Sequence, residues 1–334
     1  MKDDVAVERA ADILGPRARR DEPLAPLTTY RVGGRAALFV RATEPADLLA
    51  VATAHRETGL PVLVVGRGSN LLVADEGFTG IAVTVADLAG DVEVEAGPGP
   101  DGHVVVAAGG GVALPVLARR TAAAALTGFE WAVGVPGSVG GAVKMNAGGH
   151  GSDMAACLVG VDLVELGDGD ERIDGDLVER GDGDGVRTVP AAALGLRFRG
   201  SDVGDHQVVL RARLRLAPGD REHSEREIAE IVRWRREHQP GGQNAGSVFV
   251  NPVPGEISAG ALVDGLGLRG LRIGSAWVSE KHANFIQAAE HGRSADVRAV
   301  MEEVRRRVAE ATGYHLRSEV RLVGFEASPA AVAR

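Results

Sequence analysis

Apolar and polar positions near the N-terminus predict a strand, a helix and a second strand. Residues 36–41 (AALFVR) have the pattern of a strand, and a helix is expected to start near Thr43, with Pro45 in its first turn, and to run to Gly59. The continuous apolar run 61–65 is typical of a buried strand. This order predicts a βαβ unit with a right-handed crossover.

The middle of the chain, about residues 92–217, has a different pattern of short β-rich runs. One Ala-rich helix, 114–126, interrupts them and is expected to stop at Gly128. The expected strands cover residues 104–107, 158–166 and 208–216.

The last third of the chain is predicted to form two amphipathic helices and a closing strand. Ser224 followed by Glu227 has the spacing of a capping box and predicts the start of the first helix. Apolar residues at helical spacing over 297–308 predict the second, which is expected to end near Gly313. The strand is expected over 320–323, so the chain consists of three α+β pieces without a detectable internal repeat.

The tract 167–185 is acidic and glycine-rich and contains Gly-Asp-Gly-Asp twice. Its spacing does not match the twelve-residue calcium loop, and no glutamate closes such a loop. Solvated hairpin tips are the preferred interpretation.

Composition narrows the function classes. The 334 residues suggest about two domains, and the net charge of -9, from 37 basic and 46 acidic side chains, argues against a nucleic-acid partner. Cys157 is the one cysteine, so an intrachain disulfide and a cysteine metal site are excluded. An apolar run of about 20 residues and a signal-peptide core are both missing, so we expect a cytoplasmic protein without membrane insertion.

A first glycine loop, residues 64–72 (VVGRGSNLL), follows the second predicted strand. Leu71 stands where the dinucleotide fingerprint needs glycine, and the phosphate-loop sequence Gly-Lys-Ser/Thr is missing. Exposed amides, together with Ser69 and Asn70, could form an anion cradle. Taken alone, the loop is explained equally well by a plain β-turn.

A second glycine loop, residues 134–149 (GVPGSVGGAVKMNAGG), favours the cradle. It is much longer than the usual connection of about 4–6 residues, and such loops usually exist for function. Two such loops could hold a diphosphate from both sides without a lysine. A cofactor with a pyrophosphate and a flat ring fits best, and with 4% aromatic residues the chain has few side chains to stack on that ring.

Seven motifs in this order resemble the flavin-dependent UDP-N-acetylenolpyruvoylglucosamine reductases, or UDP-N-acetylmuramate dehydrogenases, of bacterial peptidoglycan synthesis. The resemblance covers nearly the whole chain, and each motif alone would be weak evidence. The motifs are Thr28–Gly34, Gly66–Leu72, Gly134–Gly149, Phe198–Ser201, Gly246–Phe249, Lys281–Phe285 and Ser318–Arg321.

The resemblance implies an α+β flavoprotein with a two-part FAD-binding fold of the vanillyl-alcohol-oxidase/PCMH type and a C-terminal α+β substrate-binding domain. The implied domains are residues 1–90 with the closing strand 320–326, residues 91–217, and the substrate-binding residues 218–319. The subclass without an extra tyrosine loop is expected. FAD would bind Gly66, Arg67, Gly68, Ser69, Asn70, Pro136, Gly137, Val139, Gly140 and Gly141.

The implied reaction is the NADPH-dependent, FAD-mediated reduction of UDP-N-acetylglucosamine enolpyruvate to UDP-N-acetylmuramate. Hydride passes from reduced flavin to the vinyl carbon, and the adjacent carbon then needs a proton. By resemblance Arg199 stabilises the enolate through the substrate carboxylate, as a planar, permanently charged guanidinium can. Glu319 would share this task, because a neutral carboxylic acid can donate a hydrogen bond. Ser247 would give the proton.

Ser247 suits proton donation better than nucleophilic attack, because its sequence neighbours offer no base and a carbanion-like carbon is itself a strong base. Lys281 is expected to hold the nucleotide diphosphate or the carboxylate of the UDP-linked substrate, and Asn284 to bind its sugar or uracil. His282 is interpreted as scaffold. The chain departs from the family pattern at Phe198, usually tyrosine, and at Arg67, usually glycine.

Two alternatives stay open at this point. One is an FAD-dependent oxidase or dehydrogenase of the same superfamily with another substrate, and the other is a non-catalytic nucleotide-sugar binder. A monomer is expected in each case.

Overall fold

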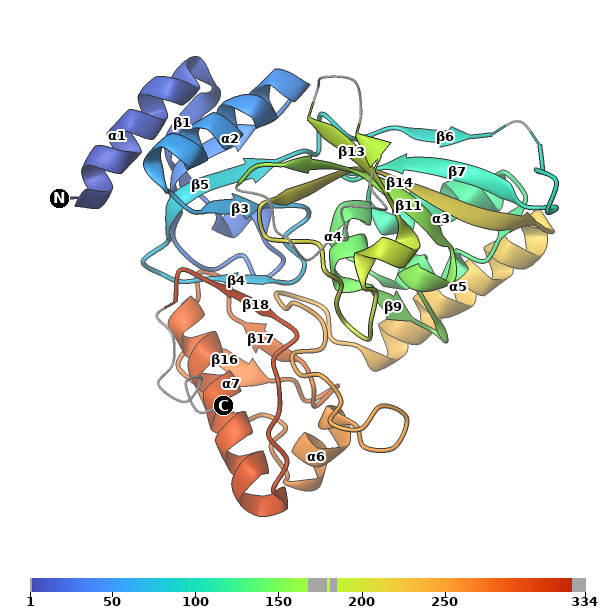
Figure 1. The fold of residues 1–334 in the computed structure, drawn as a ribbon. Helices are drawn as coiled ribbons and strands as arrows, with labels where there is room; N and C mark the ends of the chain where they lie inside the picture. The colour runs from blue at the N-terminus through green and yellow to red at the C-terminus, as the bar shows by residue number, and fades with distance from the viewer. Residues whose placement is uncertain (1, 96, 168–178, 181–184, 326–334) are drawn as a thin grey trace. The chain divides into compact units, whose positions relative to one another are not determined.

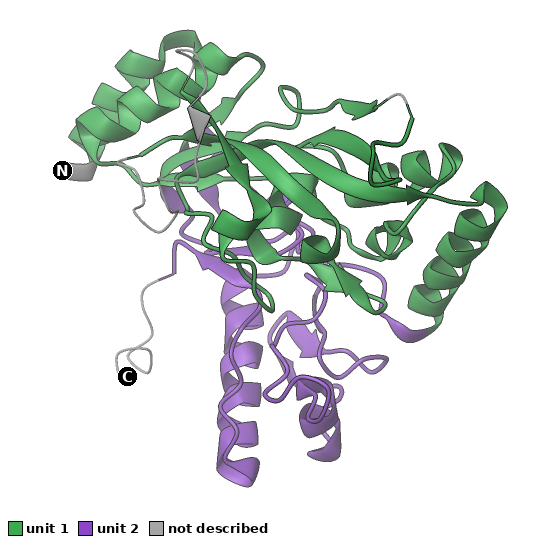
Figure 2. Cartoon of the chain, turned by 45° about the vertical axis from the view of Figure 1, so that its right-hand side comes forward, with its two compact units in different colours: residues 1–20, 38–67, 80–237 green, residues 21–37, 68–79, 238–334 purple. Residues whose placement is uncertain are grey.

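The computed structural model describes residues 2–95, 97–167, 179–180 and 185–325 (Figure 1). The chain forms two compact units and passes between them several times (Figure 2). The three-domain division stays a prediction. Unit 1 comprises Met1–Arg20, Leu38–Arg67 and Gly80–Glu237, and unit 2 comprises Asp21–Ala37, Gly68–Thr79 and His238–Arg334.

The chain contains both helices and strands, in the mixed order of an α+β protein. The helices are α1 (Lys2–Leu14), α2 (Pro45–Thr58), α3 (Leu114–Ala123), α4 (Val139–Met145), α5 (Arg221–His238), α6 (Ala259–Gly265) and α7 (Ser294–Thr312). The strands are β1 (Ala18–Pro23), β2 (Arg35–Arg41), β3 (Val62–Val64), β4 (Leu71–Val73), β5 (Phe78–Thr84), β6 (Val92–Val94), β7 (Val104–Gly109), β8 (Leu126–Thr127), β9 (Gly148–Gly149), β10 (Ser152–Asp153), β11 (Leu158–Glu165), β12 (Glu179–Arg180), β13 (Val186–Pro190), β14 (Gln207–Pro218), β15 (Arg272–Ile273), β16 (Ala276–Val278), β17 (Ile286–Ala288) and β18 (Arg321–Val323).

The predicted strand–helix–strand unit is confirmed as β2, α2 and β3. Glu44 caps α2 and exchanges side-chain-to-backbone hydrogen bonds with Asp47, and Gly59 ends the helix with φ 69°. The sheet order is β1-β2-β5-β3, so β5 lies between the two strands of the unit and pairs with β3 in parallel. The carboxyl end of β3 therefore leads directly into the first glycine loop.

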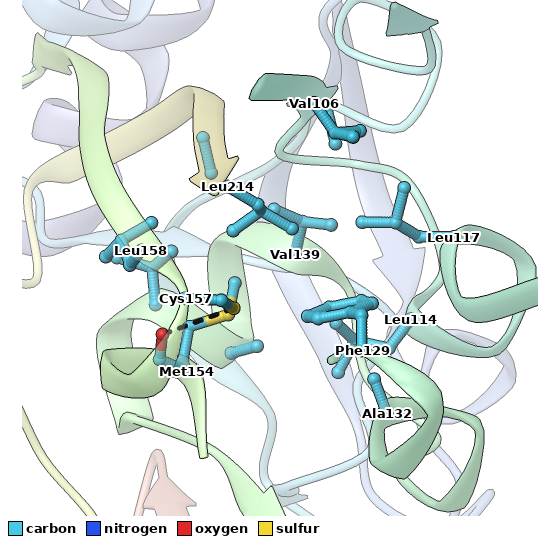
Figure 3. Packing of buried hydrophobic residues seen from close by; sticks show 14 of the residues in the cluster. Val106, Leu114, Leu117, Phe129, Ala132, Val139, Met154, Cys157, Leu158 and Leu214 are labelled. Carbon is cyan, nitrogen blue, oxygen red and sulfur yellow. Dashed lines mark hydrogen bonds between the residues drawn. The ribbon is translucent and has the colours of Figure 1, made fainter. Parts of the chain in front are cut away.

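A larger, mainly antiparallel sheet of unit 1 has the order β12-β13-β11-β14-β7-β6. One face packs on the buried residues of α3 and α4, and Figure 3 shows part of this core, including Leu117, Val139 and Leu214. Cys157 lies in the same core, where burial raises the pKa of its thiol to about 12 and its Sγ donates to the Met154 carbonyl at 3.6 Å. The thiol is therefore unreactive at neutral pH.

Two expected helix ends in unit 1 differ from the structure. Helix α3 ends at Ala123 rather than near residue 126, because Leu126–Thr127 pairs with β14 instead. Helix α5 begins at Arg221, so the capping box at Ser224 is wrong. Asp220 accepts a hydrogen bond from the His223 amide, whereas the buried Ser224 hydroxyl donates to the Glu130 carboxylate at 2.5 Å.

Unit 2 combines the three-stranded sheet β15-β16-β17, the parallel pair β18-β4 and helices α6 and α7. The predicted second amphipathic helix is confirmed as α7, which ends at Gly313 with φ 75°, and the predicted closing strand is confirmed as β18. Tyr30, Val32 and Leu72, far away in sequence, belong to the core of this unit.

The acidic tract predicted to form hairpin tips lies largely outside the described residues. Among the residues that the structure describes, no helix is long and apolar enough to cross a membrane.

Candidate functional site

The two glycine loops meet inside unit 1. A Cβ placed on Gly66 would lie 2.5 Å from the Ser138 Oγ, so the absence of a side chain at Gly66 lets the two loops approach each other. Gly66, Arg67, Pro136 and Gly141 are exposed, while Ser138 is buried. The structure thus brings together the parts of the two loops that the sequence predicted to act together.

Some amides of the second loop are already hydrogen-bonded within the protein. The Val139 amide donates to the Val112 carbonyl at 2.9 Å, and the Gly140 amide donates to the Gly110 carbonyl at 2.8 Å. The Val139 side chain is fully buried in the core. Val139 and Gly140 therefore place the loop against the end of β7, and any contact of theirs with a cofactor stays a prediction.

The turn that carries Arg199 is hydrogen-bonded to the second glycine loop. Asn146 Nδ2 donates to the Arg197 carbonyl at 3.1 Å, and the Ser201 hydroxyl donates to the Lys144 carbonyl at 2.8 Å. Arg197 and Gly200 exchange both backbone hydrogen bonds across this turn. Three predicted features of unit 1, the two loops and the arginine turn, thus form one connected region.

Arg199 has a left-handed backbone with φ 58°, a conformation that is unusual for a long side chain. The tight turn between Arg197 and Gly200 imposes it. Its guanidinium lies 5.1 Å from the centre of the Phe198 ring, which is 47% exposed. Such strain often accompanies a functional role, and here it sets the direction in which the side chain leaves the turn.

The remainder of the first glycine loop belongs to unit 2. Gly68 has φ 58° and is buried against the backbone of Leu27 and Thr28. Its carbonyl accepts from the Thr29 amide at 3.2 Å. The Ser69 carbonyl accepts from the Thr29 hydroxyl at 3.5 Å. This part of the loop therefore packs against the Thr-Thr-Tyr-Arg-Val-Gly-Gly motif within unit 2.

Ser247 lies in a short extended segment, residues 246–250, which we call the Ser247 segment. Gly246, the first residue of the segment, has φ 76°, and its amide donates to the Asn244 Oδ1 at 3.0 Å. Glycine suits this turn, because it adopts a positive φ without steric cost. The half-buried Ser247 then pairs with Phe285 in an antiparallel bridge.

Glu319 lies on the other side of the Ser247 segment. Its amide donates to the Val248 carbonyl at 2.8 Å, and Phe249 forms an antiparallel bridge with Ser318. Asn70, at the end of the first glycine loop, donates from Nδ2 to the Glu319 carbonyl at 2.9 Å. Ser247, Glu319 and Asn70, which the sequence singled out separately, therefore belong to one hydrogen-bonded region of unit 2.

Lys281 lies exposed in a compact turn between β16 and β17. The buried Ser279 hydroxyl accepts from the amides of Lys281, at 3.1 Å, and His282, at 3.4 Å. The Nδ1 of His282 accepts from the Asn284 amide at 3.2 Å, so this nitrogen carries no proton. Burial, together with the nearby Arg269, lowers the pKa of His282 and favours this neutral form.

Asn284 differs from the expected substrate-binding side chain. It is buried, its Oδ1 accepts from the Phe249 amide at 3.0 Å, and its Nδ2 donates to the Phe249 carbonyl at 2.9 Å. Both ends of the amide are thus engaged by the Ser247 segment. We therefore leave Asn284 out of the proposed substrate contacts and assign it a place in the scaffold.

Two residues of the second glycine loop, to which the sequence prediction assigned no role, shape the site. Ser138 faces Gly66 and caps α4, since its Oγ accepts from the Gly141 amide at 3.4 Å. Asn146 has φ 38° and links the second loop to the arginine turn. A serine before a short apolar run and an asparagine before Ala-Gly-Gly are ordinary signals of helix ends.

Comparison with known proteins gives first the class and then the family. Residues 36–173 match the FAD binding domain family, so the region with the two glycine loops defines a flavoprotein of this class. Residues 238–323 match the UDP-N-acetylenolpyruvoylglucosamine reductase, C-terminal domain. The chain belongs to the UDP-N-acetylenolpyruvoylglucosamine reductase family.

Named relatives and a solved structure carry this assignment. The UDP-N-acetylenolpyruvoylglucosamine reductase of Heliobacterium modesticaldum is 40% identical over 91% of this chain and 90% of its own. That of Rubrobacter xylanophilus is 38% identical over 93% of this chain and 97% of its own. The crystal structure of UDP-N-acetylenolpyruvylglucosamine reductase from Thermus caldophilus superimposes with a TM-score of 0.72 at 32% identity, over 92% of this chain and 99% of that chain.

The residues present fit an FAD diphosphate. The approach of Gly66 to Ser138 forms a cradle that a single methyl group at position 66 would fill. A phosphate needs hydrogen-bond donors without bulk, and glycine-rich backbone supplies them. The cofactor is FAD, and the expected flavoprotein fold and family are confirmed.

Proposed function

We propose that the protein catalyses the NADPH-dependent reduction of UDP-N-acetylglucosamine enolpyruvate to UDP-N-acetylmuramate, a step of peptidoglycan precursor synthesis. Family membership and the FAD binding domain support the oxidoreductase class and the UDP-sugar substrate. The observation that carries the residue assignment is the pairing of the Ser247 segment with Glu319 inside one unit, through the 2.8 Å hydrogen bond between the Glu319 amide and the Val248 carbonyl.

FAD, when bound, supplies a two-electron centre that takes hydride from NADPH and gives it to the vinyl carbon of the substrate. We assign the diphosphate to the cradle between the two glycine loops, with Gly66, Arg67, Gly137 and Gly141 as its neighbours. The exposed guanidinium of Arg67 suits phosphate oxygens, because it is a permanent cation with several N–H donors.

Arg199 binds the substrate carboxylate in this proposal. Hydride addition at the vinyl carbon leaves negative charge on the adjacent carbon, and the carboxylate shares that charge. A fixed guanidinium stabilises the transition state more than the ground state, and one such donor typically contributes about 10²–10³ in rate. The constrained turn at Arg199 limits the directions open to the side chain, which favours preorganisation.

Ser247 donates the proton. Its O–H bond breaks as a C–H bond forms at the carbon next to the carboxylate, and solvent returns a proton to the serine oxygen. Glu319, on the neighbouring chain segment, assists by hydrogen bonding to the carboxylate or to the serine. Lys281, exposed on its compact turn, contributes a charge for the UDP diphosphate.

Ser247→Ala tests the proposal in two half-reactions. Reduction of the enzyme-bound flavin by NADPH is expected to be unchanged, because it needs no proton from Ser247. Reoxidation by the enolpyruvyl substrate is expected to slow by about 10²–10⁴, the usual contribution of a general acid. Stopped-flow absorbance near 450 nm follows both steps. An unimpaired second half-reaction would remove Ser247 from its role.

Oxygen uptake by the reduced protein and its absorbance spectrum after purification decide between the competing functions. A flavin oxidase would consume oxygen rapidly after reduction and would ignore the enolpyruvyl substrate. A non-catalytic nucleotide-sugar binder would show no flavin absorbance after purification.

A further inference from the structure

We propose that Asn284 is a positioning residue for proton transfer and acts by fixing the backbone that carries Ser247. The inference rests on the function proposed above. It replaces the expected sugar or uracil contact of Asn284, and it concerns a side chain that touches neither the substrate nor the cofactor.

The first observation is that isolated bridges, rather than a regular ladder, join the Ser247 segment to the segments on either side. These bridges pair Ser247 with Phe285 and Phe249 with Ser318. Isolated bridges fix an extended strand less firmly than a continuous ladder does, because a ladder constrains each residue through its neighbours. A proton donor in such a segment needs another source of rigidity, since small displacements of a reacting group are costly in rate.

Asn284 supplies that rigidity through two side-chain hydrogen bonds, in addition to the backbone bond that belongs to the Ser247–Phe285 bridge. Its side chain binds the amide and the carbonyl of Phe249, at 3.0 and 2.9 Å, as a neighbouring strand would. Its own carbonyl accepts from the Val248 amide at 2.8 Å. Two successive residues after Ser247 are therefore bound to one asparagine.

Asn284 is itself held in place. It is 4% exposed, and its amide donates to the Nδ1 of His282 at 3.2 Å. Next to it the Phe285 amide donates to the His282 carbonyl, and the Ser279 amide donates to the Phe285 carbonyl, at 3.0 and 2.8 Å. The Lys-His-Ala-Asn-Phe motif is thus a rigid turn that presents a side-chain amide to the Ser247 segment.

Glu319 completes the arrangement from the opposite side, where its amide donates to the Val248 carbonyl. The Ser247 backbone lies between two fixed segments, so only the serine χ1 remains to be set. The asparagine at position 284 suits this place, because its side-chain amide offers a donor and an acceptor as a peptide group does.

Asn284→Asp is the sharpest variant, since it keeps the shape and the acceptor but loses the N–H donated to Phe249. Ser294→Ala is the matched control, because it also removes a buried hydrogen bond of unit 2, here the 2.9 Å bond from the Ser294 hydroxyl to Asp75. Three quantities are measured for each: amide hydrogen exchange at Val248 and Phe249, flavin reduction by NADPH, and flavin reoxidation by the enolpyruvyl substrate in H₂O and D₂O.

We expect Asn284→Asp to leave NADPH reduction unchanged and to slow reoxidation at least tenfold with a larger solvent isotope effect. The Phe249 amide keeps its acceptor in this variant, so its exchange should quicken less than in Asn284→Ser, whose shorter side chain loses both bonds to Phe249. The control should change none of the kinetic values. In a Ser247→Ala background the same substitution should have no further effect on reoxidation, since there is no proton donor left to position.

Equal slowing with and without the Ser247→Ala substitution would overturn the inference, because Asn284 would then act by another route. A Ser247→Ala enzyme with normal reoxidation would instead overturn the proposed function. If Asn284→Asp does not fold, amide hydrogen exchange in the unaltered protein tests the inference. Rapid exchange at the Phe249 amide would contradict a fixed Ser247 segment. Slow exchange that becomes faster in Asn284→Ser would support it.

Discussion

The glycine loops of unit 1 and the Ser247 segment of unit 2 depend on opposite features: the first on a missing side chain, and the second on a side-chain hydrogen bond. At Gly66 the absence of a side chain lets the Ser138 side chain of the second loop approach. The Ser247 segment depends on the Asn284 side chain, because its amide bonds Phe249 as a neighbouring strand would. The first region tolerates no added bulk and the second tolerates no lost donor. The two regions should therefore respond differently to equally small substitutions.

Gly68→Ala should have the largest effect on stability. Alanine would adopt a left-handed backbone at φ 58°, and its methyl group would overlap the Leu27 carbonyl, which is fixed backbone. Strain and overpacking together should lower the free energy of unfolding by roughly 2–5 kcal/mol. Urea unfolding followed by circular dichroism measures the change. A loss below about 1 kcal/mol, less than overpacking typically costs, would show that the Thr-Thr-Tyr motif moves aside.

Gly66→Ala should have a smaller effect, because the methyl group meets the end of a side chain rather than backbone. The Ser138 Oγ, 2.5 Å away, can rotate, at the cost of its hydrogen bond to the Gly141 amide. We expect a loss of about 1 kcal/mol in unfolding free energy, with less flavin retained after dialysis.

The double variant Gly66→Ala with Ser138→Ala provides the control for this interpretation. The new methyl group would then lie 3.6 Å from the Cβ of residue 138, an ordinary contact. Flavin retention should recover relative to Gly66→Ala alone. If both variants lose flavin equally, crowding of the cradle is not the cause.

The smallest effect should appear as a dependence on pH in the turn that holds Asn284. The pKa of His282 lies below the ordinary value of 6.5 in the folded protein, owing first to burial and then to Arg269. As the pH falls below about 6.5, the unfolded chain takes up the proton first, so the free energy of unfolding decreases until the lower, folded pKa is passed.

His282→Asn should reduce this dependence, since an asparagine at this position can accept the same backbone hydrogen bond without titrating. Unfolding at about pH 7.5 and about pH 5.5, on either side of the ordinary histidine pKa, measures the difference. His150, whose pKa is lowered by burial and by Arg235, should account for part of the dependence that remains. An unchanged pH dependence would mean that His282 is not protonated on unfolding in this range.

Much of the fold could be predicted because local signals were strong. The first-turn Pro45 and the terminal Gly59 marked α2 to within a residue or two. The end of α3 and the start of α5 were missed because the deciding interactions are distant in sequence. Leu126 pairs with β14, and Ser224 binds Glu130 instead of capping its own helix.

The candidate site was predictable where it depends on residue type alone, as in the two glycine loops. The role of Asn284 was not predictable, because a buried and an exposed asparagine look alike in sequence. Only the fold shows that Phe249, 35 residues earlier in the chain, takes both of its hydrogen bonds.

The chain's repeated passage between units restricts how the C-terminal segment can be exchanged among relatives. The match to residues 238–323 suggests a separable module, yet Tyr30, Val32 and Leu72 fill its core, and β18 pairs with β4 from the first glycine loop region. In a chimera joined at residue 238, the C-terminal segment would pack against core residues and pair with a strand β4 that come from the other protein. Transplantation must therefore carry residues 21–37 and 68–79 along with the C-terminal segment.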